Sequence, residues 1–448
     1  MSARDLALSI VERLRGGGQT AYLAGGCVRD VLLGRDPKDY DVVTDAQPPR
    51  VRELFPDAIA VGAQFGVMLV RREGVQVEIA TFRSDHAYLD GRRPSGVTFT
   101  ASAEQDVLRR DFTINGLLWD PEREEVLDFV GGRRDLEARL VRAIGDPAER
   151  FAEDQLRLLR AVRFAARLGF EVESTTFEAI RAQATAIERV AVERVRDELV
   201  RILTEGGARR GFELLDATGL LAQLLPEVAA MQGVAQPPEF HPEGDVWAHT
   251  LLMLEMMRNP SPTLAVGVLL HDVGKPPTFR VAERIRFDGH VEVGARMAEQ
   301  ICGRFRFASR EIVQIVALVE NHLRFKDAPR MKESTLKRFL RLEGFEEHLE
   351  LHRLDCWSSH RNLENYEFVR RARERLPEEA IRPAPLVSGT DLIAAGYTPG
   401  PLFRRILQAV EEAQLDSRVK THSEAMELVR TQFPASNALP RRGEDHPQ

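Results

Sequence analysis

Two aspartates separated by one residue, Asp39 and Asp41, stand in the segment DYDVV. The apolar residues of this segment predict a short β-strand, and side chains two positions apart on a strand point to the same face. Two carboxylates on one face can bind hard cations such as Mg²⁺. A pair of such ions can activate an attacking hydroxyl group and neutralise the leaving phosphate of a nucleotide. The spacing therefore indicates metal-dependent chemistry on a phosphate.

A pair of glycines, Gly25 and Gly26, precedes the aspartates by about a dozen residues. Glycine lets backbone N–H groups approach a phosphate closely. The segment CVRDVLLG that follows predicts a helix whose positive N-terminal end would face the same anion. Either feature alone is common in turns. At this spacing the two together predict a phosphate cradle beside a metal site.

The combined pattern GGxVRDxLLG followed by DxD resembles the signature of the polymerase-β-type nucleotidyltransferases, in the class II group that contains tRNA CCA-adding enzymes and bacterial poly(A) polymerases. The resemblance implies that Asp39 and Asp41 hold Mg²⁺ and that Glu78, in VEIATFR, is a third catalytic carboxylate on a neighbouring strand. The segment RRDFTINGLLWDP resembles the family segment that contacts the ribose, although Gly116 stands where the family pattern has alanine. The resemblance implies nucleotide contacts from Gly25, Gly26, Arg29, Arg110, Asp111 and Asn115.

The segment FAEDQLRLLRAVRF places Asp154 and Arg157 three positions apart, on one face of an expected helix. The simplest interpretation is a surface ion pair worth under about 1 kcal/mol. An Asp acceptor beside an Arg donor also complements the edge that cytosine and adenine share, an amine next to a ring nitrogen, whereas guanine and uracil present the reverse. The EDxxR motif resembles the family's protein template for the base. The resemblance implies CTP and ATP as substrates, with Arg160 and Arg163 as further nucleotide contacts.

Histidines are concentrated in one part of the chain, with eight of the 11 between positions 241 and 360. Four histidines and two aspartates on successive helices can converge on a metal. The pattern H…HD…H…H…D resembles the HD superfamily of metal-dependent phosphohydrolases. The resemblance implies a divalent transition metal or Mg²⁺ held by His249, His271, Asp272, His290, His322 and Asp355.

Periodicity and length predict several domains, since 448 residues exceed one ordinary core. Strand signals dominate the first third, including a hairpin around Glu73 and Gly74, and helical periodicity dominates from Pro147 onward. We expect an α+β polymerase-β-type head followed by a mostly helical neck, HD domain and tail. The expected boundaries are 1–145 for the head, 146–235 for the neck with the templating helix, 236–370 for the HD domain, 371–435 for a helical tail in contact with tRNA, and 436–448 for a disordered end.

The composition limits the cellular compartment and the partners that we expect for this protein. No apolar run is long enough for a membrane span, and three widely spaced cysteines offer no disulfide framework, so we expect a cytoplasmic protein. A net charge of −7 does not exclude nucleic acid, because only local clustering matters. The resemblance implies tRNA as the partner, without DNA or membrane, and leaves the oligomeric state open.

Three alternatives to CCA addition remain at this level. The chain could be a poly(A) polymerase or an A-adding enzyme, it could act mainly as an HD-type phosphatase or phosphodiesterase on RNA ends, or it could only bind RNA. The polar loop between Arg83 and Thr98 resembles a flexible family loop that enzymes adding only CC shorten, which favours addition of a terminal A.

Overall fold

The computed structural model describes residues 1–62, 65–85 and 97–434, and these residues form two compact units, 1–316 and 317–448. The division falls within α17 (Ser309–Asn321). Most of the loop expected between Arg83 and Thr98, and the tail expected over 436–448, lie outside the described residues. No helix in the described ranges is both long and apolar enough to cross a membrane.

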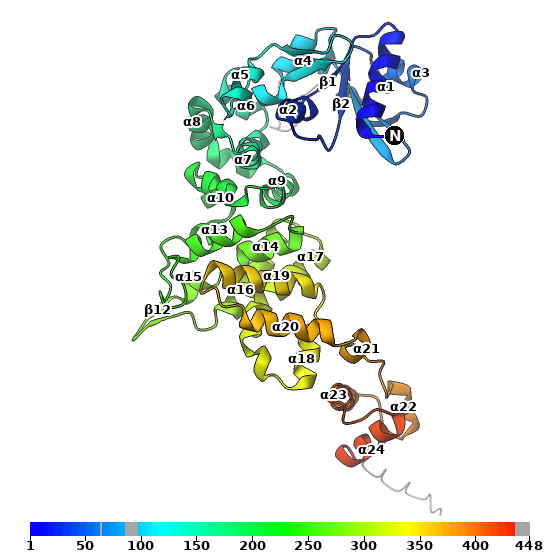
Figure 1. Cartoon of the computed structure of the whole chain (residues 1–448), viewed down its shortest axis with the longest axis vertical. Helices are drawn as coiled ribbons and strands as arrows, with labels where there is room; N and C mark the ends of the chain where they lie inside the picture. Colours follow the sequence, from blue (N-terminus) through cyan, green and yellow to red (C-terminus); the bar gives the residue numbers. More distant parts are fainter. Residues whose placement is uncertain (63–64, 86–96, 435–448) are drawn as a thin grey trace, which may run out of the picture. The chain divides into compact units, whose positions relative to one another are not determined.

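The first unit begins with a seven-stranded mixed sheet of order β3-β4-β5-β2-β1-β8-β9. Within this sheet only the β2–β5 pair is parallel, and β6 and β7 form a separate hairpin. Helix α1 packs against β1, β2 and β5, as Figure 1 shows at the N-terminal end of the chain. The elements of this head are α1 (Ala3–Gly16), β1 (Ala21–Ala24), α2 (Gly26–Leu32), β2 (Asp41–Thr44), α3 (Pro48–Leu54), β3 (Ile59–Gly62), β4 (Val67–Arg72), β5 (Val75–Thr81), β6 (Arg83–Asp85), β7 (Val97–Phe99), α4 (Ala103–Leu108), η2 (Thr113–Asn115), β8 (Leu117–Asp120), β9 (Glu125–Asp128), α5 (Gly132–Glu137) and β10 (Leu140–Val141).

The predicted hairpin is confirmed. Strands β4 and β5 pair antiparallel, and the turn between them places Glu73 and Gly74 at φ values of 49° and 81°. Two consecutive positive φ values are those of a type I′ turn, whose twist matches that of the flanking strands. Residues of β5 then alternate between the two faces of the sheet, so Val77 and Ile79 are buried while Gln76 and Glu78 are exposed.

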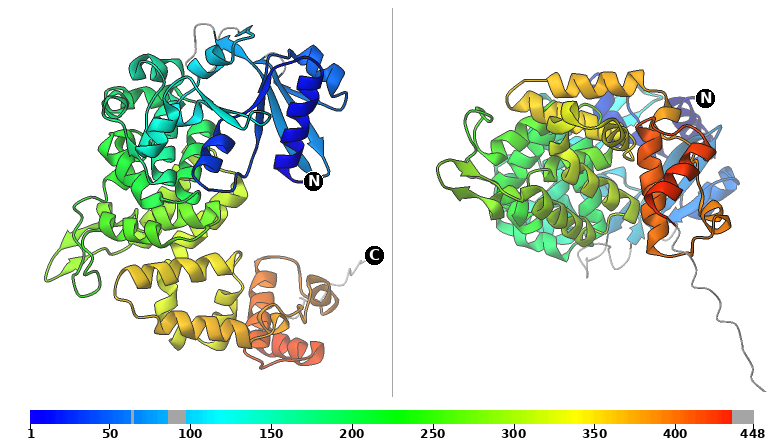
Figure 2. Two further views of the ribbon diagram at one scale, coloured as in Figure 1. Left: turned by 45° about the horizontal axis from the view of Figure 1, so that its top comes forward. Right: turned by 90° about the horizontal axis from the view of Figure 1, so that it is seen from below.

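Helices make up nearly all of the first unit beyond the head, and its helical part is coloured green in Figure 2. Helix α7 is buried along almost its whole length and packs against α9 and α10. These elements are α6 (Pro147–Glu153), α7 (Leu156–Leu168), β11 (Glu171–Val172), α8 (Ser174–Gln183), η3 (Ala184–Arg189), α9 (Val192–Thr204), α10 (Ala208–Ala217), α11 (Leu220–Leu224), α12 (Pro226–Ala229), α13 (Val246–Met256), α14 (Pro262–Leu270), α15 (Lys275–Thr278), β12 (Arg280–Val281), β13 (Ile285–Arg286) and α16 (His290–Arg304).

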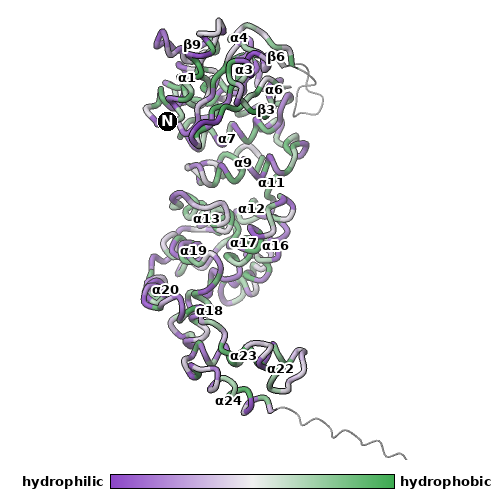
Figure 3. The backbone as a smooth tube through the Cα atoms, turned by 90° about the vertical axis from the view of Figure 1, so that its right-hand side faces the viewer, coloured by the Kyte–Doolittle hydropathy of each residue, from purple (hydrophilic) through white to green (hydrophobic). Residues whose placement is uncertain are grey.

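The second unit is entirely helical in its described residues and has two separate apolar clusters. Phe325, Phe339 and Val369 belong to the first cluster, and Leu392 and Ile406 to the second. Hydrophobic and hydrophilic residues alternate along these helices in Figure 3, as amphipathic packing requires. The helices are η4 (His322–Arg330), α18 (Glu333–Leu340), α19 (Phe345–Ser358), α20 (Glu364–Arg375), α21 (Glu378–Ile381), α22 (Gly389–Ala394), α23 (Pro401–Leu415) and α24 (His422–Gln432).

A buried carboxylate fixes the start of α8 to the head. Glu173 caps this helix by accepting hydrogen bonds from the backbone N–H of Thr176 and from the hydroxyl groups of Thr175 and Thr176, and it pairs with Arg142 at 3.2 Å. The backbone N–H of Ala143 donates to the same Thr176 hydroxyl at 3.2 Å. Burial raises the pKa of Glu173, but these hydrogen bonds lower it more, to about 2.

Glu173→Gln is expected to lower the free energy of unfolding by about 2 kcal/mol at pH 7, because the amide loses the charge that these donors stabilise. The folded pKa lies below the ordinary value of 4.5, so the contribution is present above pH 4.5 and disappears as the pH falls towards 2. Urea unfolding at a series of pH values measures the difference. The exposed Glu178→Gln on the same helix is the control, expected to change stability by under about 0.5 kcal/mol.

Candidate active site and metal centre

The two aspartates of the DxD pattern line one cavity in the first unit, with a volume of about 610 Å³. Strand β2 begins at Asp41, so Asp39 lies in the loop before it rather than on the strand that the sequence predicts. The ladder with β1 ends at the Ala24–Asp41 pair, because Gly25 turns the neighbouring chain away with a φ of 73°. Both aspartates are nevertheless exposed and the intervening Tyr40 is buried. The predicted common side of the two carboxylates therefore holds without a strand.

Glu78, on β5, lies directly opposite Asp41 in the parallel pair that β5 forms with β2. The cavity wall restricts water around Asp41 and raises its pKa to about 6, and the charges of Glu78 and Asp39 add to this rise while Arg110 opposes it. Three carboxylates gathered at one place repel one another unless a cation joins them. The donor set is all oxygen, which is the set that Mg²⁺ prefers, and it fits the predicted metal.

The glycine pair connects β1 to α2, whose first residue is Gly26. Gly25 adopts a left-handed conformation, and a side chain there would meet the guanidinium group of Arg110 at 3.4 Å. That contact distance is an ordinary one, so the chain needs glycine at this position for its backbone angle rather than for space. The two glycines and Arg29 line the same cavity as the aspartates.

A chain of hydrogen bonds runs along the cavity wall through residues that are far apart in sequence. Arg29 donates to the side-chain oxygen of Asn115 at 2.6 Å, and the amide of Asn115 donates to Asp111 at 3.3 Å. Arg160, on α7, donates to the second oxygen of Asp111 at 2.6 and 2.8 Å. Burial raises the pKa of Asp111, but Arg160 outweighs this effect and the pKa lies below its usual value. The residues predicted to contact the ribose and the helix predicted to select the base thus share one network.

Arg110 and Arg163 are held by other acids. Arg110 pairs with Asp106 at 2.9 Å. Arg163 pairs with Glu198 of α9 at 2.6 Å, and both side chains are about 5% exposed. Both arginines still line the cavity. The residues that line the cavity include nine cationic side chains and six carboxylates. The cationic residues are Arg29, Lys38, Arg109, Arg110, Arg157, Arg160, Arg163, Arg167 and Arg194. This excess of positive charge suits a polyphosphate.

The pair predicted to select the base, Asp154 and Arg157, differs from its expected geometry. The sequence predicts that Asp154 and Arg157 share a helix face, but Asp154 lies between α6 and α7 with extended backbone angles, φ −145° and ψ 103°. Its carboxylate pairs with Arg194 of α9 at 2.8 Å, whereas Arg157 pairs with Glu153. The simplest interpretation of the spacing, an ion pair between Asp154 and Arg157, is therefore wrong, and so is their expected position on one helix. The helix breaks here because the Asp154 carboxylate accepts the N–H of Leu156, an interaction that competes with helical hydrogen bonds.

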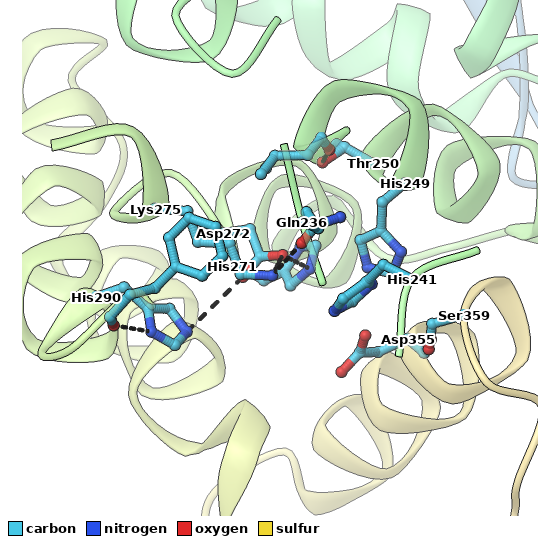
Figure 4. A network of polar contacts seen from close by, with 12 residues as sticks. Gln236, His241, His249, Thr250, His271, Asp272, Lys275, His290, Asp355 and Ser359 are labelled. Atoms are coloured by element: carbon cyan, nitrogen blue, oxygen red, sulfur yellow. Dashed lines mark hydrogen bonds and ion pairs between the residues drawn. The ribbon is translucent and has the colours of Figure 1, made fainter. Parts of the chain in front are cut away.

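The metal-binding pattern in the first unit is built around α13, α14 and the segments that follow them (Figure 4). A ligand atom of His249 lies within 4.8 Å of one of His271, and the Nε2 of His290 lies 3.9 Å from Asp272. His271 and His290 each direct Nδ1 at a backbone carbonyl oxygen 2.8 Å away. A donating Nδ1–H leaves the lone pair on Nε2, which is the tautomer that binds a metal. These donors fit a divalent metal with nitrogen preference.

His322 and Asp355 belong to the second unit. His322 begins η4 and is buried, and its Nδ1 lies 2.7 Å from the carbonyl oxygen of Val319. Asp355 lies in α19. Their predicted role as metal ligands stays a prediction from the sequence pattern.

Sequence reasoning missed several residues that the structure brings to these sites. Arg194 is one, since it lies 40 positions from Asp154. Glu243 is another, since its carboxylate lies 2.8 Å from Nδ1 of both His241 and His249. Burial raises the pKa of Glu243, but the hydrogen bonds from the two histidines lower it to about 2. The only available signal was the proximity of Glu243 to His241 and His249 in sequence, which is not specific.

The fold defines a polymerase-β-type nucleotidyltransferase head followed by a helical region and an HD domain. Three family models match the chain in this order. They are described as the poly A polymerase head domain over residues 21–142, the probable RNA and SrmB-binding site of polymerase A over 169–232, and the HD domain over 246–378.

Curated relatives and solved structures agree with these models. The CCA-adding enzyme of Bacillus pumilus is 41% identical over 218 residues, which are 49% of this chain and 54% of the relative. That of Geobacillus kaustophilus is 43% identical over 226 residues, 50% of this chain and 55% of the relative. The crystal structure of the Bacillus stearothermophilus CCA-adding enzyme in complex with CTP matches at 28% identity and a TM-score of 0.73, covering 96% of this chain and 98% of that chain.

The matches therefore span about half the length of these two curated relatives. All three cysteines are free and buried, as expected without a disulfide framework. Together the family models, relatives and structures support membership of the family of CCA-adding enzymes and poly(A) polymerases.

Proposed function

We propose that the chain adds CMP and AMP, from CTP and ATP, to the 3′ end of tRNA without a nucleic-acid template. The observation that carries the proposal is the single cavity lined both by Asp39 and Asp41 and by Asp154 and Arg157. A carboxylate pair suited to a metal supports nucleotidyl transfer, and an acceptor and a donor that line the same cavity support selection of a base.

Each group then has a defined task. Mg²⁺ bound by Asp39 and Asp41, with Glu78 beside them, would supply Lewis acidity towards the 3′-hydroxyl group and the leaving pyrophosphate. The arginines of the wall hold the triphosphate, and the Arg29–Asn115–Asp111 network orients the ribose. Asp154 accepts the exocyclic amine of cytosine or adenine, and Arg157 donates to the ring nitrogen.

Product length tests this assignment against its alternatives. The protein is incubated with tRNA that ends before CCA, Mg²⁺ and each labelled nucleoside triphosphate in turn and together. Three added residues support CCA addition. A parallel incubation uses tRNA that already ends in CC. A single A added to that second substrate, with no C added to the first, supports an A-adding enzyme, and a long A tract supports a poly(A) polymerase. No incorporation would contradict nucleotidyl transfer and leave the HD domain as the main activity.

A second activity is proposed for the HD domain, hydrolysis of a phosphoester at an RNA end by a divalent metal site that includes His249, His271, Asp272 and His290. The Nδ1 hydrogen bonds of His271 and His290 support this proposal, because they set the tautomer that a metal requires. The bound metal would supply an activated water at neutral pH. Asp272 would be the carboxylate ligand, and Lys275, 2.7 Å from it, would balance its charge.

His271→Ala is expected to lower the affinity for Co²⁺ by about 100-fold or more, because the ring of His271 supplies one of the nitrogen ligands. Metal content after dialysis, measured by elemental analysis, and hydrolysis of bis(p-nitrophenyl) phosphate are the two measurements. His422→Ala, an exposed histidine on α24, is the matched control and should change neither. Unchanged metal content in His271→Ala would contradict the HD assignment without affecting the nucleotidyltransferase assignment.

A further inference from the structure

A carboxylate outside the HD pattern lies between two imidazole rings in the first unit. Oε1 of Glu243 is 2.8 Å from Nδ1 of His249 and 2.8 Å from Nδ1 of His241. The two rings are 5.0 Å apart and nearly perpendicular, and Figure 4 shows them side by side. Only His249 belongs to the pattern from which the metal site is proposed. The HD pattern therefore gives no role to Glu243 or His241.

The distances indicate hydrogen bonds rather than a shared metal ion. Two ligands bound to one metal at about 2.0–2.1 Å in a tetrahedral arrangement lie about 3.3 Å apart. A charge-assisted N–H···O bond has a length of about 2.7–2.9 Å, which matches the observed 2.8 Å on both sides of Glu243. The Nδ1 atoms of His241 and His249 are therefore donors, and His249 is left with Nε2 as its metal-binding nitrogen.

Glu243 gives His249 a different orienting group from those of His271 and His290, the other proposed histidine ligands of the first unit. Nδ1 of His271 and of His290 donates to a backbone carbonyl oxygen, which is neutral. Nδ1 of His249 donates to a carboxylate, whose negative charge makes Nε2 a stronger donor to a cation. Nδ1 of His241 donates to the same oxygen and helps to hold the carboxylate in this position.

The free-energy cost of burying the Glu243 carboxylate at this position indicates that it is there for function rather than for stability. The Glu243 side chain is 6% exposed, and Oε2 has no hydrogen-bond partner within the part of the chain that the structure describes. A buried carboxylate with half of its acceptor capacity unused destabilises a fold unless something else requires it. A cation bound nearby through His249 would supply that requirement.

The geometry points to Glu243 as the positioning residue of the HD metal site, which orients the His249 imidazole and strengthens it as a metal ligand. This inference rests on the HD site proposed above. Positioning carboxylates of this kind alter metal affinity by about 10- to 100-fold when they are removed.

Metal affinity is the direct test. The full-length protein is titrated with Co²⁺ in excess Mg²⁺, because histidine nitrogens prefer Co²⁺ while the carboxylates of the head are already occupied. Glu243→Gln is expected to weaken Co²⁺ binding by about 10- to 100-fold and to change the visible absorption of the bound ion. Glu239→Gln, an exposed glutamate of the same loop, makes the same charge change and should bind Co²⁺ as the wild type does. Wild-type affinity in Glu243→Gln would overturn the inference.

A second variant and a second measurement separate positioning from damage to the fold. Glu243→Asp keeps the negative charge and should recover part of the lost affinity, whereas an equal loss in both variants would overturn the inference. Nucleotide incorporation by the head should stay at the wild-type rate in both variants, which shows that the unit is folded. If His271→Ala loses Co²⁺ but Glu243→Gln does not, the HD site holds and the role of Glu243 fails. If neither variant loses Co²⁺, the HD site itself is contradicted.

Discussion

Asp39→Ala is expected to lower kcat for the incorporation of both CMP and AMP by about 10³-fold or more. The carboxylate is one of the two that would hold Mg²⁺, and the loss of about 4 kcal/mol of charge stabilisation in the transition state corresponds to that factor. The effect should be equal for the two nucleotides, because this residue faces the phosphates rather than the base. Single-turnover incorporation of labelled CTP and ATP into tRNA measures it.

Stability distinguishes a catalytic loss from unfolding in this variant. Asp39 is exposed and lies outside regular secondary structure, so its replacement should change the free energy of unfolding by under about 0.5 kcal/mol. Asp36→Ala, in the same loop and also exposed, is a matched control that should keep full activity. If Asp39→Ala retained nucleotide incorporation, the proposed Mg²⁺ site of the head would be contradicted, irrespective of the result for Asp41.

Asp154→Ala is expected to reduce CTP and ATP incorporation by about 10²-fold and to raise UTP and GTP incorporation relative to them. The variant lacks the acceptor for the exocyclic amine, and a site built to bond such a group loses about 2–3 kcal/mol of discrimination when the bond cannot form. The ratio of kcat/KM values for the four triphosphates is the measurement.

Arg194 gives this second prediction a structural reason and an additional check. It pairs with Asp154 at 2.8 Å from the neighbouring helix α9 and fixes the direction of the carboxylate. Arg194→Met should therefore blur nucleotide choice in the same direction as Asp154→Ala, though less. The exposed Glu149→Ala on α6 serves as the control. Unchanged selectivity in Asp154→Ala would count against the templating role while leaving nucleotidyl transfer intact.

Local patterns in the sequence were sufficient for features that depend on neighbours in the chain. The hairpin around Glu73 and Gly74 follows from turn chemistry between two alternating apolar runs, and both strands are present. The common side of Asp39 and Asp41 follows from their spacing. The succession of a nucleotidyltransferase head and an HD domain follows from the order of the motifs, and the family models match in that order.

Contacts between residues that are distant in the sequence were determined by tertiary packing. The register of the parallel β2–β5 pair is what brings Glu78 level with Asp41, and no local pattern encodes a register between strands almost 40 residues apart. The same holds for Asp154, which its spacing placed on one helix face with Arg157 and which the structure pairs with Arg194. Hydrogen bonding of its side chain to the next turn ends one helix and begins another, so the i, i+3 rule does not apply there.

The residue types and spacings of the sequence thus determined which chemical groups this protein carries. They are carboxylates suited to a metal that acts on a phosphate, an acceptor and a donor suited to a base, and histidines suited to a second metal. Only the tertiary structure decided how each group is held: Asp111 by Arg160, Asp154 by Arg194, and His249 by Glu243. The physical reason is that helical and strand periodicity is a property of adjacent residues. The direction, charge and tautomer of a side chain are instead set by whichever buried group packs against it.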